Sequence, residues 1–298
     1  MLGILSGSPR RIKLPFLLDL VIVSDPAQIE QVEHSRDIDR LHTYPTQSLP
    51  WWVKLYFRAT KFYDASRDLW FCPFESTSNP TYRTRRTYLE EKTAIGYRPE
   101  DVQRIAQMLR TEVSDDSLAQ EMVQIVNHRF FKQEIPANIS ETAKHTVQKF
   151  SEVVIPWKYS KGVKAQKHLM NYCDRTLPAN VHSLDVGHNI GEVMQSTAGA
   201  LKILKDNLDK PIEEIFTTHA PTEQVPRIAV KASTLDGLLS SPTTPGKTVV
   251  ILKLAKAAAQ TKDIRFTFGA FQTDRACVFQ DFFLSFMADL QSTLKAEP

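Results

Sequence analysis

Cysteine is scarce in this 298-residue sequence, which contains only Cys72, Cys173 and Cys277. The three are widely spaced, and no Cys-x-x-Cys pair of the kind that binds zinc occurs. An odd number of distant cysteines is typical of reduced thiols in an intracellular protein. Net charge is also small: the formal value of +3 favours neither nucleic acid nor an anionic membrane as a partner.

The sequence also lacks an apolar run long enough to span a bilayer. The run over residues 14–23 is interrupted by Pro15 and Asp19, and no small-residue cleavage site follows it. Basic residues precede this run, so a targeting sequence is the less favoured alternative. We expect a cytoplasmic protein without a membrane span.

Common catalytic motifs are missing as well. There is no Gly-x-Ser-x-Gly, no phosphate-binding P-loop and no Gly-x-Gly-x-x-Gly. Apolar residues make up 42% of the chain and charged residues 24%, which is ordinary for a globular protein. Because no internal repeat and no Gly/Ser-rich linker occurs, we expect one domain over residues 1–298.

Most of the chain after Pro80 carries the apolar spacing of helices. Helices are expected over residues 27–34, 82–92, 98–109, 118–131, 140–152, 163–175, 188–208 and 277–294. Asp25-Pro26 and Ser114 supply the start signals of the first and the fourth of these. Short strands are expected over residues 21–23, 227–231 and 248–254. The aromatic, proline-rich residues 44–80 favour an irregular segment of loop and short helices packed on the core, with the lining of an apolar ligand pocket as the alternative. The sequence thus predicts a mainly α fold with a small β component.

A Phe-Gly turn followed by Arg-x-Cys stands out near the C-terminus. Phe268 and Gly269 open this segment, and Arg275 and Cys277 close it before an expected helix. Unpaired backbone N–H groups at a helix N-terminus favour a thiolate, and a thiolate is one of the axial ligands of haem iron. The alternative for Cys277 is a small buried side chain in an amphipathic helix.

The order of elements over residues 211–294 resembles the last third of the cytochromes P450. It runs from a Pro-Arg pair through an apolar strand, Leu-Asp-Gly, Pro-Gly and a Val-rich strand to the Phe-Gly turn and Arg-x-Cys. The resemblance implies a shortened P450-like fold with Cys277 as the iron ligand of haem b. Because a guanidinium suits a carboxylate, it also implies a set of haem-propionate partners. These are Tyr82, Arg86, Arg227 and Arg275.

Several positions depart from the P450 pattern. The Glu-x-x-Arg signature is absent, because Thr217 stands three residues after Glu214 where arginine is expected. The loop before Cys277 is two residues longer than usual. Thr273 and Phe279 stand where glycines would allow positive φ and close approach to a macrocycle.

The resemblance places residues 188–208 where P450s have their oxygen-activating helix, with an adjacent acid and alcohol. Here Glu192 precedes Ser196 by four residues and Thr197 by five. Residues four apart on a helix are neighbours, so Glu192 and Ser196 are candidates for proton delivery, with a surface glutamate as the alternative. Asp185, flanked by His182 and His188, suggests a metal site without specific ligand spacing.

The leading expectation is therefore a divergent P450-type oxidoreductase that oxidises or rearranges a small apolar molecule. Its partners would be that substrate and a redox partner protein, with no nucleic acid. One alternative is a haem-free enzyme on the same scaffold that performs a non-redox step such as terpenoid cyclisation. The other is a P450-like activating partner of a glycosyltransferase.

Overall fold

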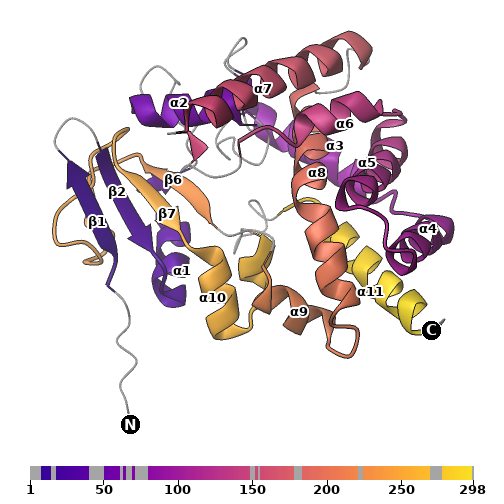
Figure 1. Cartoon of the computed structure of the whole chain (residues 1–298). Helices are drawn as coiled ribbons and strands as arrows, with labels where there is room; N and C mark the ends of the chain where they lie inside the picture. The colour runs from indigo at the N-terminus through magenta and orange to yellow at the C-terminus, as the bar shows by residue number, and fades with distance from the viewer. Residues whose placement is uncertain are drawn as a thin grey trace. The chain divides into compact units, whose positions relative to one another are not determined.

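The computed structural model describes residues 8–14, 18–39, 50–60, 63–64, 69–70, 80–147, 152–153, 155–177, 183–220, 224–268 and 277–296 (Figure 1). The chain divides into two compact units. The first, here the sheet unit, comprises Met1–Pro50, Phe74–Asn79 and Glu213–Cys277. The second, here the helical unit, comprises Trp51–Pro73, Pro80–Ile212 and Val278–Pro298. The single domain over residues 1–298 stays a prediction.

The sheet unit is built on a five-stranded sheet in the order β1-β2-β7-β6-β3. Its strands are β1 (Arg10–Leu14), β2 (Leu18–Val23), β3 (Ile38–Asp39), β6 (Val225–Ala229) and β7 (Val249–Leu252). The β2 and β7 strands are parallel, with Leu20 opposite Val249, and the other pairs are antiparallel. The sheet therefore joins the N-terminal segment directly to the segment before the Phe-Gly turn.

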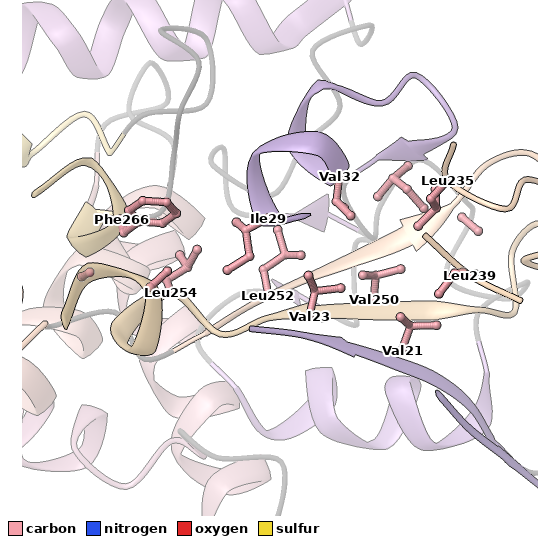
Figure 2. Close-up of a cluster of buried hydrophobic side chains, with 14 residues drawn as sticks. Val21, Val23, Ile29, Val32, Leu235, Leu239, Val250, Leu252, Leu254 and Phe266 are labelled. Atoms are coloured by element: carbon pink, nitrogen blue, oxygen red, sulfur yellow. The ribbon is translucent and has the colours of Figure 1, made fainter. Parts of the chain in front are cut away.

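The described part of the sheet unit also contains four helices. They are α1 (Pro26–His34), most of α9 (Ile212–Thr218), α10 (Leu254–Thr261) and the 3-10 helix η5 (Ile264–Phe268). Of these, α1, α10 and η5 contribute to one apolar cluster. Val21 and Val23 lie two apart on β2 and point to the same face, where they meet Ile29 of α1 and Leu252 of β7 (Figure 2). Asp25 caps α1 by accepting a hydrogen bond from the Gln28 amide at 3.1 Å.

The helical unit contains the remaining long helices. They are α2 (Trp51–Ala59), α3 (Pro80–Thr93), α4 (Pro99–Arg110), α5 (Asp115–Phe131), α6 (Ala137–Ala143), α7 (Pro156–Thr176), α8 (Ser183–Lys205) and α11 (Gln280–Ala296). Two short strands, β4 (Tyr63–Asp64) and β5 (Leu69–Trp70), form a separate pair. The α8 helix packs along α5, and α11 contacts both α4 and α8.

Glycine allows two close helix contacts around α7. A Cβ atom at Gly162 would lie 2.8 Å from Val147 and 3.1 Å from the carbonyl oxygen of Ala59. A Cβ atom at Gly187 of α8 would collide with Met170 of α7. These contacts fix α2 and α8 against the buried side of α7.

The predicted fold class is confirmed: the described chain is mainly helical with a small sheet. Asp25-Pro26 and Ser114 both start helices as expected. The expected helix over residues 140–152 is instead α6, which ends at Ala143. Residues 51–59, in the segment where loop and short helices are expected, form the nine-residue helix α2. Among the described residues no helix is both long and apolar enough to cross a membrane.

Candidate functional site

Cys277 is the last residue of the sheet unit and precedes α11 by three positions in the chain. Its thiol is half-buried and forms no disulfide. Gly269 and Arg275 lie outside the described residues, and Phe268 is described only as the last residue of η5. The structure thus places the predicted ligand, and the roles predicted for the loop before it stay predictions.

Phe279, which stands where P450s have glycine, packs into an aromatic cluster of the helical unit. Its ring centroid lies 5.6 Å from that of Phe130 on α5. Phe282 of α11 contacts the same ring in an edge-on arrangement at 5.0 Å. This contact gives Phe279 a structural role that glycine could not fill, since edge-on and tilted aromatic pairs stabilise packing beyond their buried area.

Arg227, a predicted propionate partner on β6, lies in a buried ion pair. Its Nε atom is 2.8 Å from Oε1 of Glu33 on α1, and the two side chains are only 5% and 2% exposed. Its Nη1 atom also donates to the carbonyl oxygen of Pro226 at 3.0 Å. A carboxylate of the chain therefore already neutralises this guanidinium inside the sheet unit.

Tyr82 and Arg86 lie one turn apart on α3, as their spacing predicts. Arg86 Nε donates to Glu90 Oε1 at 2.7 Å, and Arg86 Nη1 donates to the Tyr82 hydroxyl at 3.5 Å. Tyr82 is 4% exposed. The pair is therefore preformed, with a carboxylate from the same helix already bound to the guanidinium.

The neighbouring Arg85 has a role that sequence reasoning missed. It is buried and donates twice to Asp185 of α8, at 2.6 Å and 3.2 Å. Because the two residues are a hundred positions apart, no local sequence pattern predicts this pairing. Asp185, considered as a metal ligand with its flanking histidines, thus has an arginine partner. His182 lies outside the described residues, within which no group of three possible metal ligands occurs.

Glu192, Ser196 and Thr197 all lie on α8. The Ser196 hydroxyl bonds to the main chain of Glu192 rather than to its carboxylate. Ser196 Oγ donates to the main-chain carbonyl oxygen of Glu192 at 2.7 Å. Thr197 is 6% exposed. Burial raises the pKa of Tyr56 on α2 above its ordinary value, and the carboxylates of Glu152 and Glu192 raise it further. The Tyr56 hydroxyl is therefore protonated and interacts electrostatically with the Glu192 carboxylate. The density of aromatic residues over residues 44–80 gave no reason to select Tyr56 from among them.

Two buried threonines make hydroxyl contacts where the Glu-x-x-Arg signature is absent, one within α9 and one between η5 and α9. Thr217, at the expected arginine position, is fully buried and donates to the carbonyl oxygen of Glu213 at 2.8 Å. Thr267 of η5, also fully buried, donates to the carbonyl oxygen of Phe216 on α9 at 3.1 Å. This second bond ties α9 to the segment that enters the loop before Cys277.

Two hollows open in the helical unit, and neither is lined by a predicted site residue. One, of about 340 Å³, lies between the end of α4 and the end of α8, where Met108 and Lys205 line it. The other, of about 620 Å³, lies between α4 and α5 and is lined mainly by charged and polar side chains, including Arg98 and His128. The first hollow has a mixed apolar and charged lining and the second a mainly polar one, so neither resembles an enclosed apolar ligand site.

Comparison with known proteins identifies the fold. No protein-family model matches the sequence, and no curated protein matches it. The chain is similar in structure to the cytochrome P450 PksS of the Bacillus subtilis 168 bacillaene polyketide synthase, with a TM-score of 0.62 and 11% identity over 97% of this chain and 84% of that one.

Two further structures give the same result. A 6-coordinated cytochrome P450 from Thermus thermophilus has a TM-score of 0.62 and 12% identity over 97% of this chain and 86% of that one. The mycinamicin VIII C21 methyl hydroxylase MycCI from Micromonospora griseorubida has a TM-score of 0.61 and 14% identity over 97% and 85%. The chain therefore has a divergent cytochrome P450 fold, which confirms the recognition from its C-terminal motifs.

Proposed function

We propose that this protein is a P450-type oxidoreductase that binds haem b through Cys277 and acts on a small apolar molecule. The observation that carries the proposal is the position of Cys277. In a chain with this fold, it is a half-buried thiol outside any disulfide, three positions before the last helix. A soft thiolate ligand suits a haem iron.

The residues that the resemblance assigns to the haem suit the group chemically, but two of the arginines already bind other carboxylates. Arg227 and Arg86 each bind a carboxylate of the chain, Glu33 and Glu90. A propionate is also a carboxylate, so each guanidinium could hold it in place of its present partner. The proposal assigns the iron to Cys277 and the propionates to Arg86 and Arg227, with Tyr82 and Arg275 in support.

A bound haem would supply the oxidative chemistry, while the chain supplies the ligand, the orientation and the exclusion of water. The Glu192 carboxylate, which contributes to the raised pKa of Tyr56, is a group on α8 that could hold or move a proton. Because Ser196 donates to a main-chain oxygen, it does not form the adjacent acid–alcohol pair of P450s. The proposal therefore includes peroxide-dependent oxidation and rearrangement of a pre-oxidised substrate beside oxidation with a redox partner protein.

A haem-free function on the same scaffold is the second candidate. Two observations favour it: the buried Glu33–Arg227 pair satisfies a propionate partner without haem, and Phe279 fills space through its contact with Phe130. The function would then be a non-redox step such as terpenoid cyclisation, or activation of a glycosyltransferase. A P450 fold supports either, because fold alone does not fix function.

Titration of the purified protein with hemin distinguishes the two candidates. The oxidoreductase proposal predicts saturable binding of one hemin per chain and a Soret band that changes in Cys277→Ser. Cys173→Ala is the matched control, because Cys173 is a buried thiol in the helical unit and should leave the titration unchanged. Hemin binding that is absent or never saturates would favour the haem-free function, and a spectrum identical in Cys277→Ser would show that Cys277 is not the iron ligand.

A further inference from the structure

The α7 helix concentrates the basic charge of the chain. It contains Lys158, Lys161, Lys164, Lys167 and Arg175 against a single acidic residue, Asp174. The helix therefore carries a larger positive charge than the entire sequence, whose formal net charge is +3. The small net charge of the whole chain is therefore compatible with a strongly basic surface along α7.

These residues lie on the outer side of the helix. One stripe along the helix, which we call the α7 face, consists of Trp157, Lys161, Lys164, His168 and Arg175. The first four follow one another at intervals of three or four positions, and the last follows after seven positions, which is about two turns. All five are exposed. The buried residues of α7, which include Gly162, Leu169 and Cys173, lie on the opposite side against the core. At 1.5 Å per residue the stripe is about 27 Å long.

The basic side chains of the α7 face are available for an external partner. Among the described residues, no carboxylate forms an ion pair with Lys161, Lys164 or the flanking Lys167, whereas Lys158 pairs with Glu152 at 3.1 Å. Trp157 leads the stripe and is 74% exposed. Trp51, at the start of α2, is 56% exposed, and α2 packs against α7 (Figure 1).

We propose that the α7 face docks on the surface of an anionic lipid bilayer. Lysines near such a surface are attracted by its negative potential, and their long alkyl stems tolerate the headgroup region. Tryptophan prefers the same region because its ring is apolar while its N–H can bond to water or headgroups. The apolar side of α7 is packed in the core, so the helix would lie on the membrane rather than enter it.

Other polyanions fit the α7 face less well. Lysine is depleted at the centres of protein–protein interfaces, where arginine is enriched. Nucleic acids are read mainly through arginine and groove contacts, whereas this stripe is straight and contains one arginine, at its far end. An exposed tryptophan at the tip of a lysine stripe matches a planar interface with apolar depth.

Flotation of the full chain with vesicles tests the proposal. Vesicles of phosphatidylcholine with about a third phosphatidylserine should bind the protein, pure phosphatidylcholine should not, and high salt should weaken binding because salt screens surface charge. Lys161→Glu/Lys164→Glu should lower binding at least tenfold. Trp157→Ala should lower it several-fold and reduce the blue shift of tryptophan emission that we expect on binding.

The control is Lys231→Glu/Lys247→Glu, which makes the same change in net charge at two exposed lysines of the sheet unit. It should bind vesicles within about twofold of the unchanged protein. Equal losses in the two double variants, or equal binding to neutral vesicles, would overturn the proposal. So would failure to bind anionic vesicles together with binding of polyglutamate or duplex DNA through Lys161 and Lys164, which would identify a different partner.

Discussion

The helical unit and the sheet unit both bury arginine–carboxylate pairs, but the pairs differ in what else the arginine could bind. In the helical unit, Arg129 donates to both oxygens of Asp101, at 2.8 Å and 2.9 Å. Asp101 also accepts a hydrogen bond from the Arg98 backbone amide at 2.9 Å, so its carboxylate caps the N-terminus of α4 as well. In the sheet unit, Arg227 pairs with Glu33, although the P450 resemblance assigns Arg227 to a haem propionate.

This difference shows that a residue's type and place in a motif do not fix its partner. The P450 resemblance assigns no ligand role to Asp101 or Arg129, and their contacts join α4 to α5. In the Glu33–Arg227 pair, a structural role competes with a ligand role for one guanidinium. The following changes separate the two situations, beginning with the one expected to have the largest effect.

Glu33→Gln should have the largest effect on stability, because it leaves the Arg227 guanidinium buried without its carboxylate. Breaking a buried ion pair from one side costs about 3–5 kcal/mol, which urea denaturation would measure. Glu33→Leu combined with Arg227→Met should recover most of this loss, since it removes both charges. If Arg227 can bind a haem propionate, Glu33→Gln should also tighten hemin binding. A loss of unfolding free energy below about 1 kcal/mol would show that the pair contributes little to the stability of the fold.

Asp101→Asn should cost about 2–3 kcal/mol at pH 7, because it leaves Arg129 without its carboxylate. Burial alone would raise the pKa of Asp101, but the hydrogen bonds from Arg129 and from the Arg98 amide lower it below its ordinary value. The pair therefore stabilises the fold above the unfolded-state pKa of about 3.9, and its contribution disappears as pH falls through the lower folded-state pKa. Urea denaturation at pH 7 and pH 3 should show a smaller difference between the two proteins at pH 3. A constant difference would contradict the assignment.

Phe279→Ala should cost about 1–2 kcal/mol through lost aromatic contact and apolar burial. The change tests whether Phe279 supports the aromatic cluster with Phe130. Phe279→Leu should retain most of the stability, since it keeps much of the apolar volume. If the side chain also obstructs haem, Phe279→Ala should raise hemin affinity and Phe279→Leu should not.

The smallest effects are expected at the helix caps, where the two units should behave alike. Asp25 caps α1 in the sheet unit and Ser114 caps α5 in the helical unit, with contacts to backbone amides of 3.1 Å and 3.2 Å. Asp25→Ala and Ser114→Ala should each cost about 1 kcal/mol. A much larger loss in either variant would mean that the side chain does more than cap its helix.

The elements that the sequence predicted best are those with local signals. Asp25-Pro26 and Ser114 marked helix starts, and the Val-rich run at residues 248–254 contains β7. The β1 strand was missed because Arg11 and its neighbours suggested a basic leader. In the sheet, Arg11 pairs with Asp19 across the β1–β2 hairpin at 2.8 Å. The α10 helix was missed because its first residue, Leu254, continued the apolar pattern of the preceding strand.

The candidate site was only partly predictable, because several of its contacts join residues that are far apart in the sequence. The spacing of Tyr82 and Arg86 predicts that they share a helix face, which the structure confirms. The partners of Arg85 and Arg227 come from remote parts of the chain, so only three-dimensional packing brings Asp185 and Glu33 to them. Buried guanidinium groups need a carboxylate, but the sequence does not say which one.

Carbon monoxide binding by the reduced protein tests the central claim most directly, because the spectrum reports the iron ligand itself. The oxidoreductase proposal predicts that hemin-loaded protein, once reduced and exposed to carbon monoxide, shows the red-shifted Soret band of thiolate ligation. Cys277→Ser should lose this band, and Cys173→Ala should keep it. A protein that takes up no hemin, or whose band is unchanged in Cys277→Ser, would contradict the claim.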